Sequence, residues 1–310
     1  MKLIVQPGAG LLPVVDAIRR AKRSVDIAVF RLNRKEIETA LAQAVQRGVR
    51  VRALIAHTNR GGEDRLRRLE ERLLALGVTV SRTGDEFVKY HGKYLLVDDA
   101  LYLFGFNYTK SDLTKRRSFG VQTKHRRAVS DAAKLFECDL GRQPFEGSKT
   151  SPLVVSPETS RAALTRFVKG AKRRLAIYDA RLEDPGFLKL LRQRAEAGVQ
   201  VQVIGKASKL NGATEVRALK DLRLHARAII RDGTQAFVGS QSLRALELDR
   251  RREVGVIVRN PSITRQLLEV FDRDWNDSGP KEETEEKKQE KKEEKEEKKD
   301  GRPSEAEAQA

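Results

Sequence analysis

The amino-acid sequence predicts an α/β protein of the α+β sandwich type, built from two copies of one unit. Three observations lead to this prediction: an internal repeat, apolar strands that alternate with amphipathic helices in each copy, and a charged C-terminal segment whose apolar residues are only Ala and Pro. We expect each copy to form a mainly mixed β-sheet flanked by helices, with the two copies related by a pseudo-two-fold axis. A chain of 310 residues is long enough for two such cores.

The repeat is visible in segments that match at an offset of 150 residues. The matched pairs are residues 3–7 with 153–157, residues 21–27 with 171–177, and residues 46–51 with 196–201. Further along the chain the offset falls to about 134, because the second copy has a shorter connection. This pattern is that of a duplicated unit with one insertion or deletion.

Each copy shows the same order of predicted elements. Residues 25–30 form an apolar run that predicts a buried strand, and the apolar side chains of residues 37–45 fall on one helical face. Gly48 stands where a helix end favours a left-handed residue, and a second apolar strand is expected over residues 49–55. The second copy repeats this order over residues 188–204. Such alternation favours a sheet covered by helices.

The composition divides the chain into three parts. We expect a first domain over residues 1–145 and a second over residues 146–279, with the boundary in the turn-rich segment 141–152. Residues 280–310 are rich in Lys and Glu and contain no apolar cluster that could bury a core. We expect this tail to be disordered or a lone solvated helix, without a catalytic role.

The charge of the two predicted domains favours polyanionic partners. Residues 1–279 contain 53 Lys and Arg against 32 Asp and Glu, a net charge of +21. A body with this charge attracts nucleic acid, an anionic lipid surface or another phosphate-rich partner. Aromatic residues make up only 5% of the chain, which does not favour a platform for stacking bases.

The sequence also bears on compartment and on metal binding. The single cysteine excludes an intramolecular disulfide framework, and no apolar run is long enough to span a membrane. We therefore expect a cytoplasmic protein that is at most peripheral to a membrane. Two histidines, His57 and His125, have no Cys or carboxylate cluster at ligand spacing, so no metal site is predicted.

Two motifs carry the candidate chemistry. Residues 91–98 read His91-Gly-Lys93-Tyr-Leu-Leu-Val-Asp98, and residues 225–232 read His225-Ala-Arg227-Ala-Ile-Ile-Arg-Asp232. Both follow the pattern His-x-basic-x4-Asp. If each apolar run is a strand, the histidine and the basic residue share one face and can point at a single phosphate.

Two further matched segments follow the motifs. Each copy has a turn of small residues that ends in a polar side chain, Asn107 in the first and Ser242 in the second. Each copy then has a basic pair followed by a position occupied by Ser118 in the first copy and by Glu253 in the second.

This set of residues resembles the phospholipase D superfamily, whose signature is His-x-Lys-x4-Asp followed by a Gly-Ser-x-Asn turn. The resemblance covers residues 1–279, in the two-copy arrangement of phospholipases and cardiolipin synthases. It implies two phospholipase D-like domains that meet at one active site in a single chain, so that no oligomer is required. It also implies a phosphodiesterase that works through a phosphohistidine, without a metal or organic cofactor.

The resemblance also implies roles for individual residues. It makes His91 the nucleophile and leaves His225 to protonate the leaving group and to activate water or an alcohol. The motif cations would hold the phosphoryl oxygens, and Asn107 and Ser242 would donate hydrogen bonds. The motif aspartates, Asp98 and Asp232, would be structural anchors. Glu253 is expected to contact the histidine of its own copy, His225, and to favour its protonated form.

Several alternatives stay open at this point. Phospholipid is the leading substrate, for a hydrolase or for a transferase of the cardiolipin synthase kind, and a nuclease acting on DNA or RNA is the alternative within the same superfamily. Arg227 and Ser242 depart from the family's Lys and Asn, and Arg is not interchangeable with Lys. A catalytically impaired scaffold that binds nucleic acid or lipid is therefore the alternative of another class.

Overall fold

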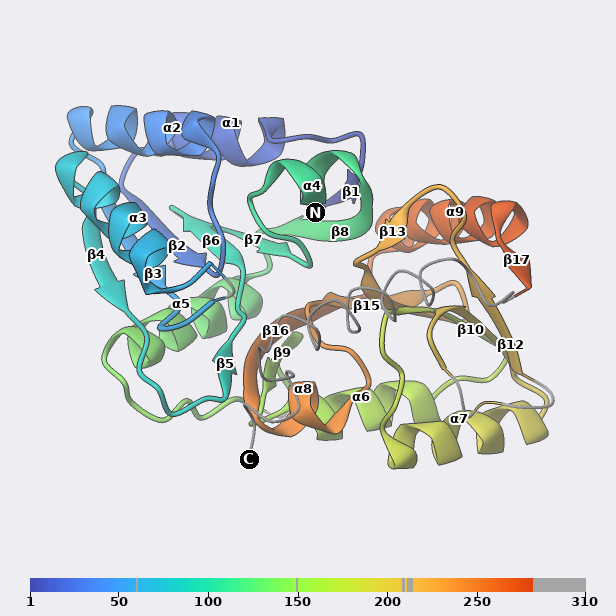
Figure 1. The fold of residues 1–310 in the computed structure, drawn as a ribbon. Coiled ribbons are helices and arrows are strands. Elements are labelled where there is room, and N and C mark those ends of the chain that lie inside the picture. The colour runs from blue at the N-terminus through green and yellow to red at the C-terminus, as the bar shows by residue number, and fades with distance from the viewer. Residues whose placement is uncertain (60, 149, 208–209, 211–213, 281–310) are drawn as a thin grey trace, which may run out of the picture.

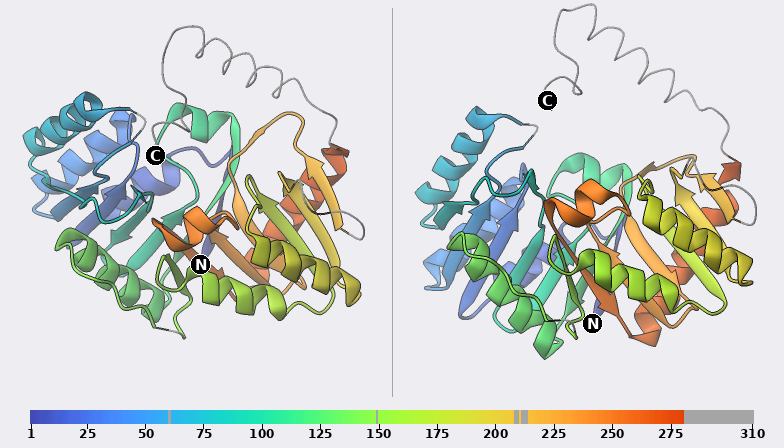
Figure 2. Two further views of the ribbon diagram at one scale, coloured as in Figure 1. Left: turned by 60° about the horizontal axis from the view of Figure 1, so that its bottom comes forward. Right: turned by 90° about the horizontal axis from the view of Figure 1, so that it is seen from below.

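A computed structural model describes residues 1–59, 61–148, 150–207, 210 and 214–280. Apart from Pro280, the tail predicted over residues 280–310 lies outside the described residues. The described chain forms two β-sheets of mixed strands, each flanked by helices, with no closed barrel (Figure 1). The two sheets lie side by side as two lobes (Figure 2). The predicted fold class is confirmed.

The first sheet contains strands from the first copy of the repeat. Strands β2, β3 and β4 are parallel, and the other neighbours are antiparallel. In spatial order the strands are β1 (Lys2–Gln6), β8 (Arg116–Thr123), β7 (Ala100–Phe104), β6 (Tyr94–Val97), β2 (Ser24–Val29), β3 (Arg50–Ile55) and β4 (Thr79–Arg82). The helices of this copy are α1 (Leu12–Arg20), α2 (Lys35–Gln46), α3 (Glu63–Ala75), α4 (Lys110–Thr114) and α5 (Arg126–Leu140).

The second sheet has the corresponding plan. Its parallel strands are β10, β11 and β12, and its path ends on a short strand taken from the first copy, β5 (Lys89–Tyr90). The other strands, in spatial order, are β17 (Gly279–Pro280), β12 (Thr214–Ala218), β11 (Gln200–Gly205), β10 (Arg174–Asp179), β14 (Arg227–Arg231), β15 (Gln235–Gly239) and β16 (Arg251–Val258), with β9 (Leu153–Ser156) also paired to β16. The helices are α6 (Ser160–Lys169), α7 (Pro185–Glu196), α8 (Ala245–Asp249) and α9 (Pro261–Asp277).

Local sequence explains where the helices begin and end. Gly48 and Gly198 follow α2 and α7 with φ angles of +79° and +84°, the left-handed conformation that glycine adopts without a steric penalty. At the other end of α7, Pro185 is the first helical residue and the side chain of Asp184 accepts a hydrogen bond from the amide of Phe187. These signals are readable in the sequence, and the strands and helices predicted over residues 25–55 lie within one or two residues of β2, α2 and β3.

The apolar side chains form three clusters. One lies between α1, α2, α3 and the first sheet, and another lies between α6, α7 and the second sheet. The third joins the copies, because α5 and α9 pack on a shared set of strands from both sheets; its aromatic members include Tyr94, Phe119, Phe136, Tyr178 and Phe271. A buried aromatic side chain is worth several kcal/mol of stability, roughly 3–5 when truncated to Ala. The shared cluster therefore holds the two sheets in a fixed relationship.

Each copy also contributes a short strand that pairs with the sheet of the other copy. Strand β5 of the first copy pairs with β16, and β13 (Arg223–Leu224) of the second copy pairs with β8. Figure 1 shows β5 running beside β16 and β13 lying near β8. Both short strands end one residue before a motif histidine, so the exchange of strands places the two motifs at the junction of the sheets.

Two further observations concern organisation. We propose the division into residues 1–145 and 146–279, because α5 ends at Leu140 and β9 begins at Leu153 in the second sheet. Among the residues that the structure describes, no helix is long and apolar enough to cross a membrane.

Candidate active site

The two motif histidines lie in equivalent places, between two strands rather than within one. His91 lies between β5 and β6, and His225 lies between β13 and β14. The apolar runs that follow are strands, β6 and β14, as expected from the alternation, but each histidine lies before its strand. The reason is a change of partner: the short strand before each histidine pairs with the opposite copy, whereas the strand after it pairs within its own sheet.

A carboxylate from the opposite copy contacts each histidine. The Nδ1 atom of His91 lies 2.8 and 3.0 Å from the two carboxylate oxygens of Glu253, and the Nδ1 atom of His225 lies 2.7 Å from Oδ1 of Asp112. The prediction that Glu253 contacts the histidine of its own copy, His225, is therefore wrong. The exchanged strands place Glu253 of β16 next to the end of β5, where His91 follows.

The two carboxylates do not occupy equivalent positions in the repeat. Glu253 is on β16 and corresponds to Ser118 on β8, whereas Asp112 is on the short helix α4 and corresponds to Glu247 on α8. The hydroxyl of Ser118 is buried without a hydrogen-bond partner in the described part of the chain. Asp112 was not among the residues predicted from the sequence. The available signal was an acidic residue five positions after Asn107 and, in the same way, after Ser242.

The hydrogen bond at Nδ1 of His91 fixes the form of that imidazole, whereas Nδ1 of His225 lies at ion-pair distance from Asp112 without hydrogen-bond geometry. A neutral histidine that donates its Nδ1 hydrogen to a carboxylate leaves Nε2 with a free lone pair. Burial lowers the pKa of His91 well below its usual value, and the nearby cations of Lys93 and Arg227 lower it further. Burial also lowers the pKa of His225, to about 4, although Asp112 opposes the shift. Both histidines are therefore neutral near pH 7 before a phosphate binds.

The two carboxylates differ in their electrostatics. Burial raises the pKa of Glu253, and the cation of Lys93 offsets only part of the effect. Burial also acts to raise the pKa of Asp112, but His225, Thr109 and Arg116 together outweigh it and hold the pKa well below the usual range. Asp112 is thus the more firmly ionised of the two partners.

The basic residue of each motif binds the carbonyl of its own histidine. Lys93 is 1% exposed and its Nζ donates to the His91 carbonyl at 2.6 Å; Arg227 donates from Nη1 to the His225 carbonyl at 2.9 Å. Burial lowers the pKa of Lys93 to about 7. Arg227 lowers the pKa of His91 and Lys93 lowers that of His225, so each motif cation acts on the histidine of the other copy.

The polar turn residues support other members of the site. Asn107 donates from Nδ2 to Asp112 Oδ2 at 3.0 Å, and Thr109 donates to the same oxygen at 2.8 Å. The hydroxyl of Ser242 accepts a hydrogen bond from Nε of Arg227 at 3.2 Å. Asn107 therefore holds the carboxylate that contacts His225, and Ser242 holds the guanidinium that binds the His225 carbonyl; their expected role as donors to phosphate stays a prediction.

An aromatic ring that was not predicted from the sequence to belong to the site, that of Phe30, packs on the first motif. The ring of Phe30 meets that of His91 edge to face, with centroids 4.7 Å apart at 79°. The Nζ atoms of Lys89 and Lys93 lie 4.9 and 5.8 Å from the centre of the Phe30 ring. Phe30 follows the end of β2, and only the pairing of β2 with β6 brings it to the motif.

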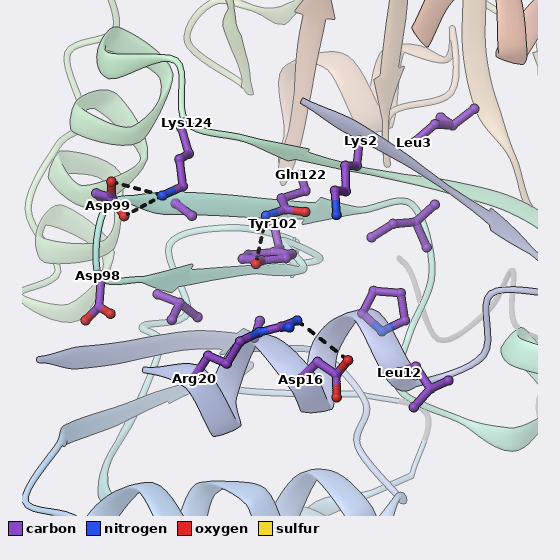
Figure 3. Close-up of a pocket in the computed structure, with 15 residues that line it drawn as sticks. Lys2, Leu3, Leu12, Asp16, Arg20, Asp98, Asp99, Tyr102, Gln122 and Lys124 are labelled. Atoms are coloured by element: carbon purple, nitrogen blue, oxygen red, sulfur yellow. Dashed lines mark hydrogen bonds and ion pairs between the residues drawn. The ribbon is translucent and has the colours of Figure 1, made fainter. Parts of the chain in front are cut away.

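The motif aspartates lie away from the histidines. Asp98 accepts hydrogen bonds from the backbone amides of residues 22–24 at 2.8–3.1 Å, and Asp232 accepts from those of residues 172–174 at 2.7–3.1 Å. Asp98 lines a groove of about 520 Å³ between α1 and the strands β1 and β7, where the pairs Arg20–Asp16 and Lys124–Asp99 also lie (Figure 3). This geometry supports an anchoring role for both aspartates.

Comparison with known proteins decides the family. The family model for "Cardiolipin synthase, PLD-like domain" matches residues 14–140 and 164–275, once in each copy. The chain belongs to this phospholipase D-like family. Proteins of the superfamily are phosphodiesterases and transferases that act on phosphodiester or phosphate groups.

Proteins similar to this phospholipase D-like chain are named as different kinds of enzyme. A polyphosphate kinase of Vibrio parahaemolyticus is 23% identical over 284 residues, a match that covers 82% of this chain and 40% of the kinase. The crystal structure of polyphosphate kinase from Porphyromonas gingivalis has a TM-score of 0.73 at 20% identity, covering 87% of this chain and 49% of that one. The matched region thus covers less than half of either kinase.

A third similar protein matches over nearly its whole length. The structure of phosphatidylserine synthase from Haemophilus influenzae Rd KW20 has a TM-score of 0.71 at 12% identity, covering 90% of this chain and 87% of that one. At these identities the similarity shows a shared fold.

Proposed function

We propose that this phospholipase D-like chain cleaves a phosphodiester through a covalent phosphohistidine on His91, with His225 as the general acid and base. The observation that carries the proposal is the pair of crossed contacts, in which Glu253 holds His91 and Asp112 holds His225. Each contact occupies Nδ1, so both imidazoles offer Nε2 to one phosphate. A nucleophile and a proton donor are the two groups that the reaction requires.

The reaction balances in two steps. In the first, Nε2 of His91 attacks phosphorus, the bond from phosphorus to the leaving oxygen breaks, and protonated His225 gives its Nε2 proton to that oxygen. In the second, His225 takes a proton from water or an alcohol, the resulting oxygen attacks phosphorus, and the phosphorus–nitrogen bond breaks. Lys93 and Arg227 stabilise the negative charge of the phosphoryl oxygens.

The different carboxylates support this division of roles. A firmly ionised Asp112 stabilises the imidazolium form of His225, which the first step needs as an acid. His91 must attack as the neutral base, and burial together with the cations of Lys93 and Arg227 favours that form. Binding of an anionic phosphate raises the pKa of His225 and so prepares the proton for transfer.

Phospholipid is the substrate that we propose first. The family description names cardiolipin synthase, and the net charge of +21 on residues 1–279 suits an anionic membrane surface that the protein would bind peripherally from the cytoplasm. The acceptor would be water in a hydrolase or an alcohol in a transferase. The same charge favours nucleic acid as the second candidate substrate.

The experiment offers three substrates side by side to the purified full-length chain and to a His91→Ala control. The substrates are vesicles of phosphatidylglycerol with phosphatidylcholine, plasmid DNA, and inorganic polyphosphate with ADP. The expected result is release of head group, or exchange of head group when glycerol is added, by the wild type alone. DNA nicking without lipid turnover would transfer the proposal to a nuclease. Phosphate transfer to ADP alone would refute cleavage of a phosphodiester.

A further inference from the structure

Two arginines stand at equivalent positions beside the catalytic histidines. The backbone amide of His91 donates to the carbonyl of Arg252 at 2.8 Å, and that of His225 donates to the carbonyl of Arg117 at 3.0 Å. Each arginine belongs to the copy opposite to its histidine. These hydrogen bonds continue the pairing of β5 with β16 and of β13 with β8.

The side chain of each arginine contacts an aspartate in the copy that carries the histidine. Arg117 binds Asp274 of helix α9 with two hydrogen bonds, Nε to Oδ2 at 2.7 Å and Nη2 to Oδ1 at 2.9 Å. Arg252, which is 1% exposed, has Nη2 at 3.1 Å from Oδ1 of Asp139 on helix α5. Asp139 and Asp274 match in the repeat, so an arginine–aspartate pair stands at equivalent places in both copies, hydrogen-bonded at Arg117 and at ion-pair distance at Arg252.

Further contacts hold each guanidinium in place. Arg117 also donates to the carbonyl of Gln6 at 3.1 Å, and Arg252 donates to the carbonyl of the matching residue, Ser156, at 2.8 Å. The hydroxyl of Tyr178 donates to Asp274 at 2.6 Å on one side, and Arg252 reaches Glu158 at 2.5 Å on the other. Guanidinium groups with this many partners, of which that of Arg252 is buried and that of Arg117 is partly buried, have one defined position.

We propose that Arg117 and Arg252 are positioning residues, each of which sets the place of one catalytic histidine across the junction of the two copies. The main chain of the arginine binds the histidine, and its side chain binds the last helix of the histidine's own copy. The inference rests on the proposed phosphohistidine function. A shift of about 1 Å in a reacting group can cost on the order of 10²-fold in rate, so a small loosening at either arginine is measurable.

We expect changes at the two arginines to cause different kinetic defects. Glu253 follows Arg252 directly, so a change at Arg252 disturbs both the backbone and the Nδ1 contact of the nucleophile. Arg117 is followed by Ser118, and it acts on the acid His225 through the main chain. A merely structural role at the junction would instead slow attack by His91 and proton transfer from His225 to the same extent in both variants.

The test uses Arg117→Gln and Arg252→Gln in the full-length chain, with Arg52→Gln as a matched control. Arg52 forms a bidentate pair with Asp26 at 2.7 and 2.9 Å within the first copy, and its exposure of 14% equals that of Arg117. The probes are 4-nitrophenyl methyl phosphate and phenyl methyl phosphate, of which only the second has a leaving group that needs a proton. The rate of phosphohistidine formation is measured in a single turnover.

We expect Arg252→Gln to slow phosphohistidine formation about 10- to 100-fold with both probes. Arg117→Gln should slow it by a similar factor with the phenyl ester but less than about threefold with the nitrophenyl ester. The control should stay within about twofold of the wild type with both. If a glutamine variant does not fold, the corresponding lysine variant carries the comparison, because Lys keeps the charge but cannot make the several contacts of the guanidinium group.

Hydrogen exchange of backbone amides gives a readout apart from activity. Exchange in Arg252→Gln should rise at residues 89–93 and stay unchanged at 223–227, and Arg117→Gln should show the reverse. Equal exchange at both segments, or the same rate loss with both probes in both variants, would overturn the positioning role. If the wild type itself forms no phosphohistidine, the proposed function fails. If the wild type forms phosphohistidine and the arginine variants form it at the same rate, only the positioning inference is refuted.

Discussion

Glu253 and His91 belong to different copies of the repeat, yet both carboxylate oxygens of Glu253 lie within 3.0 Å of Nδ1 of His91. The reciprocal contact, from Asp112 to His225, comes from a different element, a short helix rather than a strand. Neither copy alone therefore holds a complete histidine–carboxylate pair. The site depends on the exchange of β5 and β13 between the two sheets.

The first prediction concerns Asp112→Asn. The carboxylate of Asp112 raises the pKa of His225, so its removal should lower that pKa further. Since His225 must be protonated to act as an acid, the decline of kcat on the alkaline side should begin about one pH unit or more lower than in the wild type. The pH profile of kcat for phenyl methyl phosphate measures this shift. A profile that moves to higher pH would contradict the assignment of the acid.

Glu253→Gln provides the comparison for that prediction. The amide can still accept the Nδ1 hydrogen of His91, so phosphohistidine formation should be slowed by about 10-fold or less. The alkaline decline should stay where it is in the wild type, because His225 keeps its own partner. If Glu253→Gln moves the decline and Asp112→Asn leaves it in place, the two histidines have the opposite roles.

A second prediction concerns metal ions. The two histidines and the cations Lys93 and Arg227 supply nucleophile, acid and charge stabilisation, so turnover of bis(4-nitrophenyl) phosphate should survive EDTA with less than about a twofold loss. The measurement compares initial rates before and after dialysis against EDTA. Complete loss, with recovery on adding zinc or magnesium, would refute the two-histidine mechanism.

Proton uptake at Lys93 provides a third prediction. Burial lowers the pKa of this lysine to about 7, so at pH 8 it is mostly neutral in the free protein. An anion beside it raises the pKa, and binding of tungstate should therefore take up to about one proton from solution. Calorimetry in two buffers of different ionisation enthalpy measures the uptake. In Lys93→Arg, which stays charged, the uptake should be smaller by that amount while tungstate still binds.

A fourth prediction concerns residues 281–310. Every core and site residue that the structure describes lies before this segment, so its removal should change the melting temperature by less than about 1 °C. Turnover of bis(4-nitrophenyl) phosphate should also be unchanged. A clear fall in either would show that the segment packs on the body. An effect confined to vesicle or DNA binding would assign it a tethering role.

Much of the fold could be predicted from the sequence because local signals agree with the tertiary structure. Gly48 and Gly198 mark helix ends at matching places, and the apolar runs before and after them are strands in both copies. Because the chain is a repeat, each pattern occurs twice, and a pattern that recurs at the matching place can be told from a chance one. The sequence carries no comparable sign of β5 and β13, since two-residue strands have no periodicity to detect.

The sequence predicted which motif residues belong to the candidate site, but it did not predict which carboxylate contacts each histidine. His91, Lys93, His225 and Arg227 could be found by spacing alone. The partner of His225 could not be assigned by comparing equivalent positions, because Ser118 and Glu253 match in the repeat whereas the structure uses Asp112 and Glu253. The duplication has lost its symmetry there, and a repeat register predicts contacts only where symmetry is kept.

The most direct test of the central claim is to trap the covalent intermediate. Wild type, His91→Ala and His225→Ala are each mixed with phosphorus-labelled 4-nitrophenyl methyl phosphate, quenched, and digested to map the label. Because 4-nitrophenolate leaves without a proton, His225→Ala should accumulate label on His91, since the group that activates water is missing. His91→Ala should carry no label. Label on His225 would reverse the two roles, and absence of label from the wild type and from His225→Ala would contradict the phosphohistidine mechanism.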